Sequence, residues 1–230
     1  MIRYPILFFV CIAIAFNQVP DDRGYIVNVG EKSPDFILDF PDGSQISLED
    51  LKGQVTMLQF TASWCHVCRE EMPHIERKIW KVYKNMGLNV IGIDRDEPAE
   101  VVTSFAKEVQ ITYPLALDPG ADIFALFADR DSGVTRNIIL GPDGKIAFLT
   151  RLFEIQEFDQ MKRVIHNLLV DQLREQKNSL IAKKQIINKM KKQQSRSDRY
   201  FTRKLETELY KTERELKRKE RKLTLAQKRL

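Results

Sequence analysis

The sequence predicts an α/β protein in which helices flank a mixed central sheet, with a β-hairpin at the N-terminal end of the domain and a basic helical extension at its C-terminal end. Short apolar runs alternate with segments of helical periodicity between residues 30 and 170, a pattern typical of strand–helix–strand crossovers. The last two runs flank the turn Gly141-Pro142-Asp143-Gly144, which predicts an antiparallel hairpin. Residues 171–230 contain neither proline nor glycine, which favours long helices.

The composition limits the class of protein and divides the chain in two. Of the 230 residues, 43% are hydrophobic and 30% are charged, which provides for one buried core and excludes a disordered or collagen-like chain. The three cysteines are too few for a disulfide-stapled mini-protein. Residues 1–170 carry 17 Lys and Arg against 24 Asp and Glu, whereas residues 171–230 carry 20 against 8. We therefore expect two parts of opposite charge.

The first residues have the features of an export signal. A positive start at Arg3 precedes an apolar run over residues 4–16, and Ala13-Ile14-Ala15 matches a signal-peptidase site. The run is shorter than the roughly 20 residues that span a bilayer, which disfavours an uncleaved anchor. A buried N-terminal element is one alternative. Lipidation at Cys11 is another, although Val10 is larger than the residue preferred before a lipidated cysteine.

These features predict where the mature protein is found. We expect a signal peptide over residues 1–15 and a linker over residues 16–29. The mature protein is then exported to the periplasm or cell envelope, soluble or lipid-anchored. Disulfides persist in such a compartment.

The elements expected in the domain have recognisable boundaries. Pro41-Asp42-Gly43-Ser44 predicts the turn of the first hairpin, and Ser47 with Asp50 predicts a capping box. Gly87 ends the long helix after the cysteines, and Pro98 opens the next helix. We expect strands over residues 36–40, 45–48, 55–60, 88–93, 137–140 and 145–149. We expect helices over residues 47–51, 68–86, 97–109, 123–127 and 156–170.

The extension over residues 171–230 has leucine or isoleucine at every seventh position in two runs. They are Leu173, Leu180 and Ile187, and then Leu209, Leu216, Leu223 and Leu230. The second seam position of a coiled coil is poorly filled, by Thr212, Lys219 and Ala226. We expect a break at residues 193–197 and a solvated helical or partly disordered extension. A weak coiled-coil association with another chain and an anionic membrane surface stay open, whereas nucleic acid is not expected outside the cytosol.

Two cysteines lie between a buried apolar run and the long helix. Cys65 and Cys68 are three residues apart in the segment Thr61-Ala62-Ser63-Trp64-Cys65-His66-Val67-Cys68, so they can close a small disulfide ring. The first thiol of such a pair lies at the positive end of the helix dipole, which stabilises the thiolate and lowers the pKa. The thiolate is the attacking form in disulfide exchange. We therefore expect Cys65 to attack a substrate disulfide and Cys68 to resolve the mixed disulfide.

Other uses of this cysteine pair fit less well. Zinc needs four ligands, and only His66 and His74 lie near the cysteines. A c-type haem site needs His after the second cysteine, where Arg69 stands. A purely structural disulfide would close too small a loop to stabilise the fold much. We expect no bound metal and no organic cofactor, because the redox group is the Cys65–Cys68 disulfide itself.

Four stretches of the chain form a recognisable set. They are Val29-Gly30-Glu31-Lys32-Ser33-Pro34-Asp35-Phe36, Leu48-Glu49-Asp50-Leu51-Lys52-Gly53, Ala62-Ser63-Trp64-Cys65-His66-Val67-Cys68-Arg69-Glu70-Glu71-Met72-Pro73 and Gly141-Pro142-Asp143-Gly144-Lys145-Ile146. Together they resemble the extracytoplasmic thioredoxin-like thiol–disulfide oxidoreductases of bacteria, the TlpA/ResA type. The resemblance implies a thioredoxin fold over residues 30–170, with Cys65 as the nucleophile and Cys68 as the resolving thiol.

The resemblance also assigns roles to residues around the cysteines. Pro73 matches a helix-kinking proline, Trp64 an aromatic lid, and Glu71 an acidic residue that tunes proton transfer. A partly desolvated carboxyl near the thiols would have a raised pKa and could exchange a proton with the second thiol; an ordinary exposed glutamate is the alternative. Plain core packing is the alternative for Trp64. His66 either adds positive charge beside the first thiolate or faces solvent.

One position departs from the family. The family usually has a cis-proline just before the first strand of the terminal hairpin, and this chain has Thr135 there. A cis bond before a residue other than proline costs about 2.5–4 kcal/mol, so we expect a trans peptide. We expect Arg136 to place a charge beside the dithiol that favours the thiolate.

The sequence therefore predicts a thiol–disulfide oxidoreductase of the cell envelope that reduces disulfides of partner proteins. The direction of exchange, and a membrane thiol transporter as electron donor, rest on the resemblance alone. One alternative is a thioredoxin-like binding or scaffold module that presents the basic extension and keeps the dithiol as a remnant or for metal loading. The other is a thiol peroxidase, weakened because Ala62, rather than threonine, stands three residues before Cys65.

Overall fold

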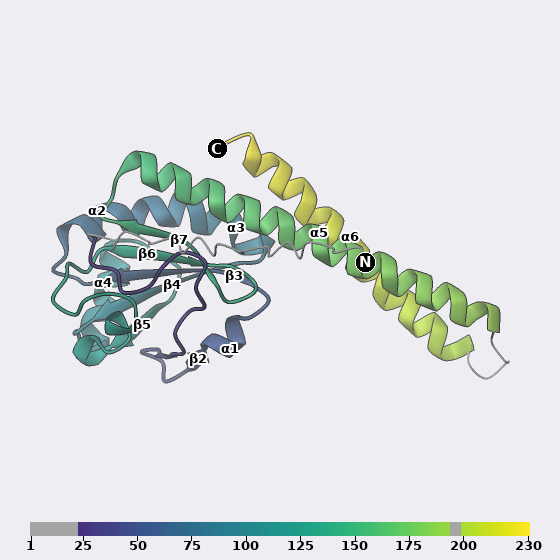
Figure 1. Cartoon of the computed structure of the whole chain (residues 1–230), viewed down its shortest axis with the longest axis horizontal. Helices are drawn as coiled ribbons and strands as arrows, with labels where there is room; N and C mark the ends of the chain where they lie inside the picture. Colours follow the sequence, from purple (N-terminus) through teal and green to yellow (C-terminus); the bar gives the residue numbers. More distant parts are fainter. Residues whose placement is uncertain (1–22, 194–198) are drawn as a thin grey trace, which may run out of the picture.

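The structure is a computed structural model that describes residues 23–193 and 199–230. A seven-stranded mixed sheet forms its centre, in the order β2-β1-β5-β4-β3-β6-β7 (Figure 1). The central strands β3, β4 and β5 run parallel, and antiparallel pairs β1–β2 and β6–β7 lie at the two edges. The bounds are β1 (Ile37–Asp39), β2 (Gln45–Ser47), β3 (Val55–Thr61), β4 (Leu88–Arg95), β5 (Leu115–Asp118), β6 (Arg136–Leu140) and β7 (Ile146–Arg151). The predicted mixed sheet and both predicted hairpins are confirmed.

Helices flank this sheet. The α-helices are α1 (Leu48–Leu51), α2 (His66–Ile75), α3 (Lys81–Tyr83), α4 (Ala99–Glu108), α5 (Ile155–Gln193) and α6 (Arg199–Gln227). The π-helix η1 (Glu76–Trp80) and the 3₁₀ helices η2 (Lys84–Met86), η3 (Pro119–Ala121) and η4 (Phe124–Leu126) complete the set. The predicted capping box of α1 is present, since Ser47 Oγ accepts from the backbone N–H of Asp50 and the Asp50 carboxylate accepts from that of Ser47.

Side chains of β3 point alternately to the two faces of the sheet. Gln59 donates a hydrogen bond to Glu71 of α2, whereas the ring of the next residue, Phe60, contacts Phe124 and Phe127. Thus α2 covers one face and η4 the other. All seven residues of β3 are buried, as expected for a strand covered on both faces.

The long helix predicted over residues 68–86 is interrupted in the structure. It begins as α2, passes through η1 and α3, and ends in η2 at Gly87, whose φ is +110°. Pro73 lies inside α2, and a proline removes one backbone donor and crowds the preceding turn. A single π turn after a proline accommodates that disturbance.

The strand β5 is absent from the sequence prediction. It has four residues, too few to show the period of two on which strand prediction depends. It forms because its backbone pairs parallel to β4, as in Ile93 with Ala116. Tertiary pairing, rather than local preference, produces this strand.

The segment before residue 30 packs on the domain. Tyr25 and Val27 are buried, and the Tyr25 hydroxyl donates to the carbonyl oxygen of Thr150 at 2.5 Å. The predicted signal peptide over residues 1–15, with Cys11, and residues 16–22 of the predicted linker lie outside the described residues.

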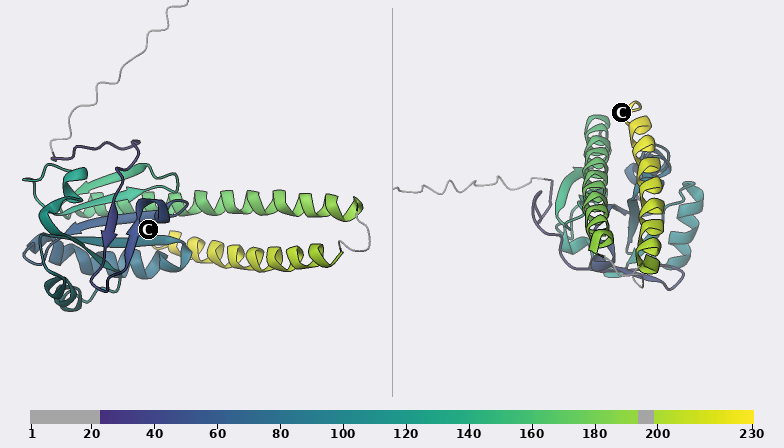
Figure 2. Two further views of the ribbon diagram at one scale, coloured as in Figure 1. Left: turned by 90° about the horizontal axis from the view of Figure 1, so that it is seen from below. Right: turned by 90° about the vertical axis from the view of Figure 1, so that its right-hand side faces the viewer.

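Two antiparallel helices extend from the domain as an arm (Figures 1 and 2). We define the arm as residues 171–193 of α5 together with α6. The predicted boundary at residue 170 falls inside α5, which continues without a break from the domain. α5 ends at Gln193 and α6 begins at Arg199. The break predicted at residues 193–197 falls almost wholly on residues 194–198, which lie outside the described chain.

Most of the seven-residue repeat is buried within this arm, and its members Leu209 and Leu230 are partly exposed. Leu173, Leu180 and Ile187 of α5 are each 7% exposed, and Leu216 and Leu223 of α6 are 5% and 3% exposed. Ion pairs cross the seam between Lys177 and Glu220, Lys184 and Glu213, and Lys191 and Glu206. Each helix is therefore the packing partner of the other. Within the described ranges, no helix is both long enough and apolar enough to cross a membrane.

Candidate active site

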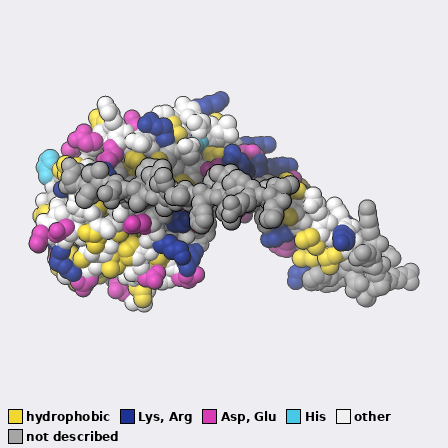
Figure 3. Space-filling model, viewed as in Figure 1, with side chains coloured by type: hydrophobic (Ala, Val, Ile, Leu, Met, Phe, Trp, Pro, Cys, Tyr) yellow, Lys and Arg dark blue, Asp and Glu magenta, His cyan; other side chains and the backbone are white. Residues whose placement is uncertain are grey.

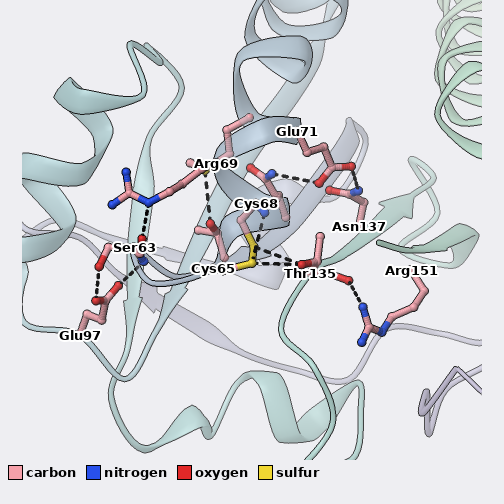
Figure 4. Close-up of a disulfide and its surroundings, with 12 residues drawn as sticks. Ser63, Cys65, Cys68, Arg69, Glu71, Glu97, Thr135, Asn137 and Arg151 are labelled. Atoms are coloured by element: carbon pink, nitrogen blue, oxygen red, sulfur yellow. Dashed lines mark hydrogen bonds between the residues drawn. A yellow bond between two sulfur atoms is a disulfide. The ribbon is translucent and has the colours of Figure 1, made fainter. Parts of the chain in front are cut away.

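The two cysteines form a disulfide at the N-terminal end of α2 (Figure 4). Cys65 is the N-cap residue, and its Sγ accepts a hydrogen bond from the backbone N–H of Cys68 at 3.2 Å. Cys65 is 7% exposed and Cys68 is fully buried. The strand β3 ends four residues before Cys65, so the chain passes directly from the sheet edge to the helix terminus. Cys65 is therefore the more accessible of the two cysteines.

Thr135 faces this disulfide. Its Oγ1 lies 3.1 Å from Cys65 Sγ and 3.3 Å from Cys68 Sγ. No cis peptide bond occurs in the described chain, which confirms the predicted trans peptide before Thr135. The carbonyl oxygen of Thr135 accepts from the backbone N–H of Leu152 at 3.2 Å and from Arg151 Nη1 at 3.5 Å. A hydroxyl therefore contacts both sulfurs where the family has a proline ring.

Arg136 is not beside the dithiol, and this expectation is wrong. Successive side chains of an extended segment point to opposite faces, so Arg136 points away from the face on which Thr135 lies. Its guanidinium stacks 4.6 Å from the ring centre of Tyr25 and donates to Ser132 Oγ at 2.8 Å. The arginine that contacts Thr135 is Arg151 (Figure 4).

Glu71 is buried one turn beyond Cys68 and belongs to a polar cluster inside the domain. Asn137 Nδ2 donates to Glu71 Oε1 at 2.7 Å, and Gln59 Nε2 donates to Oε2 at 3.4 Å. The Tyr113 hydroxyl in turn donates to Gln59 Oε1 at 2.7 Å. Burial raises the pKa of Glu71 to about 7, although the bonds from Asn137 and Gln59 oppose the shift. A carboxyl with this pKa exchanges protons at neutral pH.

A second set of polar contacts holds the loop that precedes Cys65. The Glu97 carboxylate accepts from the backbone N–H and the hydroxyl of Ser63, both at 2.5 Å. Arg69 Nε donates to the Ser63 carbonyl oxygen at 2.5 Å. The two backbone polar groups and the hydroxyl of Ser63 are thus all engaged (Figure 4). These bonds fix the path of the chain into the helix terminus.

Asp94 is a buried carboxyl near this clamp. It is fully buried in β4, and no donor group of the described residues bonds to either oxygen. Burial, followed by the neighbouring Glu97 carboxylate, raises the pKa of Asp94 to about 8. When Asp94 is protonated, its own O–H can donate a hydrogen bond to the Glu97 carboxylate, so the buried carboxyl then has a partner.

The other predicted site residues are found around the disulfide. Trp64 is 65% exposed, so plain core packing is wrong for it. His66 is the exposed first residue of α2, and Pro73 is half-buried inside the same helix. Trp64 and His66 are available to contact a bound substrate.

Asn137 and Glu97, which bond to Glu71 and Ser63, are not among the residues predicted from the sequence. Asn137 lies 66 positions from Glu71, and no local pattern joins them. Glu97 had a usable signal, since it follows the parallel strand β4 as the cysteine motif follows β3, and the carboxyl ends of parallel strands meet at one edge of a sheet. Among the residues that the structure describes, no group of three or more His, Cys, Asp or Glu could hold a metal ion.

Known proteins share this architecture and sequence. The chain is 28% identical over 151 residues to a thiol-disulfide oxidoreductase ResA of Bacillus cereus, covering 64% of this chain and 84% of the relative. The ResA of Oceanobacillus iheyensis is 30% identical over 141 residues, covering 60% and 71%.

Solved structures agree with this likeness. A candidate protein disulfide isomerase from Bacteroides thetaiotaomicron is 55% identical, with a TM-score of 0.62, covering 64% of this chain and 92% of that one. A candidate thiol:disulfide interchange protein DsbE from Chlorobium tepidum is 26% identical, with a TM-score of 0.56, covering 62% and 99%. The predicted thioredoxin fold is confirmed. The sequence profile of the AhpC/TSA family matches residues 29–149, more than half of the chain, and the chain therefore belongs to the AhpC/TSA family.

Proposed function

We propose that this thiol–disulfide oxidoreductase reduces disulfides of exported proteins through Cys65 and Cys68. One observation supports the proposal above all. Cys65, the more exposed of the two cysteines, caps the N-terminal end of α2, and the fully buried Cys68 is bonded to it. A helix N terminus stabilises a thiolate, so the attacking and resolving thiols are distinguished by position.

The reaction transfers two electrons from the dithiol to the substrate. The Cys65 thiolate attacks one sulfur of a substrate disulfide, forms a mixed disulfide and releases the other substrate sulfur as a thiolate. Cys68 then loses its proton and attacks Cys65 Sγ. The second substrate sulfur leaves as a thiolate, and the Cys65–Cys68 disulfide closes. The substrate disulfide gains the two electrons that the enzyme dithiol loses.

Glu71 is the proposed acceptor of the Cys68 proton. Its pKa of about 7 leaves a useful fraction ionised at neutral pH, and it lies on the same helix as Cys68. Thr135 Oγ1, which contacts both sulfurs, can donate to whichever sulfur carries the charge. These are the chain's own contributions to the exchange, with no organic cofactor required.

The cellular setting is also a proposal. The apolar N-terminal run and the signal-peptidase pattern over residues 4–16 support export to the periplasm or cell envelope. Continued turnover there needs a dithiol donor, since the oxidised enzyme must regain two electrons. A membrane thiol transporter is the proposed donor.

A trapping experiment tests this function. Cys68→Ser, expressed in the native envelope, should accumulate mixed disulfides between Cys65 and protein substrates that thiol reagents release. Cys65→Ser should capture none and should lose insulin reduction. If Cys65→Ser instead keeps all binding partners and the wild type reduces no insulin, the protein is a binding module. Peroxide consumption that persists in Cys68→Ser with added thiol would identify a peroxidase.

A further inference from the structure

The helix α6 has a face on which only positive charge is found. Its buried residues Leu216 and Leu223 face α5, and at 100° per residue the opposite side holds positions two and five residues beyond each of them. Continued along the helix in steps of seven, these positions form two rows, Lys204, Lys211, Arg218 and Leu225, and Thr207, Arg214, Arg221 and Lys228. We call the charged residues of the two rows the outer basic face; they are Lys204, Lys211, Arg214, Arg218, Arg221 and Lys228, all exposed.

The acidic residues of α6 lie elsewhere on the helix. Glu206, Glu213 and Glu220 flank the seam and pair with lysines of α5. Glu208 and Glu215 lie on the other flank and pair with Lys211 and Lys219 of their own helix. Within the described part of the chain, Lys211 is the one member of the outer basic face that forms an ion pair, at 3.1 Å.

Gathering charges of one sign on one face of a helix destabilises the helix. A helix that only needs to be soluble mixes the two signs around its surface and gains from i,i+4 pairs. Here Arg214, Arg218 and Arg221 are spaced by three or four residues, so like charges repel along one face. An anionic partner would remove that repulsion.

We propose that the outer basic face binds the anionic headgroups of a phospholipid bilayer. The face is straight and about 36 Å long at 1.5 Å per residue, and α5 supports it from behind. Figure 3 shows Lys and Arg side chains, with Asp and Glu among them, where the arm leaves the domain. A bilayer offers negative charge across a continuous plane, which suits a straight row of cations.

Two exposed side chains on the same side of α6 favour lipid over a purely ionic partner. Tyr210 is 62% exposed and Leu225 is 59% exposed. They lie one and two positions beyond Leu209 and Leu223, on the outward side of the helix. Tyrosine places an apolar ring and a polar hydroxyl at headgroup level, and leucine inserts just below it.

The choice of lipid also rests on the proposed export, because a bilayer is always within reach in the envelope. Bound in this way, the arm would hold the disulfide at a fixed distance from the membrane. The proposed electron donor lies in that membrane. The outer basic face takes no part in the chemistry at Cys65. An experiment can therefore contradict lipid binding without contradicting disulfide reduction, and the reverse.

The test compares two variants with the same loss of charge. Arg214→Gln with Arg221→Gln removes two cations from the outer basic face, and Lys183→Gln with Lys189→Gln removes two from α5. Full-length chains are titrated with vesicles of phosphatidylcholine containing 30% phosphatidylglycerol, and with phosphatidylcholine alone. Every chain keeps residues 4–16, so any binding by that apolar run is common to all.

We expect the α6 variant to bind anionic vesicles roughly 25-fold more weakly, at about fivefold per cation, and the α5 variant to change less than threefold. Tyr210→Ser should weaken vesicle binding without changing helicity. Insulin reduction should be normal in all three, which separates this proposal from the proposed function. Equal losses in the α5 and α6 variants, binding that is no tighter to anionic than to neutral vesicles, or tighter binding to duplex DNA at the same salt would overturn it.

Discussion

Glu71 combines two properties that a proton acceptor inside a protein needs. It is 1% exposed, and hydrogen bonds from Asn137 and Gln59 fix its carboxyl. Burial alone would push its pKa higher still, and the two amides limit the rise to about 7. The carboxyl is therefore divided between its two protonation states near pH 7.

Replacing Glu71 should slow the second step of exchange and spare the first. In Glu71→Gln the amide keeps the volume but cannot take a proton from Cys68, so resolution of the mixed disulfide should slow by roughly 10²-fold. Stopped-flow release of a fluorescent peptide thiol would show the first and second steps separately. The rise of the resolution rate near pH 7 should vanish in the variant. Glu70→Gln, a change at the exposed neighbour, is the control, and an equal slowing there would contradict the role.

The hydroxyl of Thr135 should support the charge on Cys65. It lies 3.1 Å from that sulfur, and a hydrogen bond to a charged group contributes about 1.5–3 kcal/mol. Thr135→Val keeps the shape and removes the donor, so alkylation of Cys65 by iodoacetamide should require a pH about 1 unit higher. Thr135→Ser should restore the profile. Identical profiles for all three proteins would show that the contact does not stabilise the thiolate.

The elements whose ends depend on residues close together in the sequence could be predicted from the sequence. The capping box of Ser47 and Asp50 and the glycine end at Gly87 were readable because each involves residues close in sequence. The cysteine pair is readable for the same reason, whereas the role of Glu71 is predicted from the resemblance to thioredoxin-like oxidoreductases. The strand β5 and the partner Asn137 depend on contacts between distant segments, and no window of the sequence contains both sides of such a contact.

The arm also shows what a sequence pattern cannot predict. The seven-residue spacing of Leu216 and Leu223 is visible in the sequence, but the segment that packs on these leucines is not. The structure pairs it with Leu173 and Leu180 of α5 in the same chain. The thin seam is supplemented by ion pairs on its flank, such as Lys184 with Glu213 at 2.5 Å.

A cavity in this seam should loosen the arm and leave the domain intact. Leu216 is 5% exposed, and Leu→Ala at a buried site costs about 2–5 kcal/mol. Hydrogen exchange of Leu216→Ala should speed up across α6 and residues 171–193 of α5, with β3 and β4 unchanged. Leu225→Ala, at a leucine that is 59% exposed, should leave exchange unaltered. Loss of protection throughout the sheet would show instead that arm and domain unfold together.

For the whole molecule, two buried carboxyls make stability depend on pH. Burial raises the pKa of Glu71 to about 7 and, with help from Glu97, that of Asp94 to about 8. In the unfolded chain both would ionise near pH 4. Between pH 4 and pH 8 the folded protein therefore holds protons that the unfolded chain has lost, and stability falls as pH rises. The contribution is fully present below pH 4 and is lost as pH passes the two raised pKa values.

Urea unfolding of the oxidised protein should show this slope between pH 5 and pH 8, up to about 1.4 kcal/mol per pH unit for each group. Asp94→Asn should reduce the slope of stability against pH. The amide of the variant donates to Glu97 at every pH, whereas Asp94 can donate only while it is protonated. The stability of the variant relative to the wild type should therefore increase as pH rises. Asp35→Asn, at an exposed aspartate, should keep the full slope. Stability that stays level or increases over this range in the wild type would mean that neither carboxyl retains its proton inside the fold.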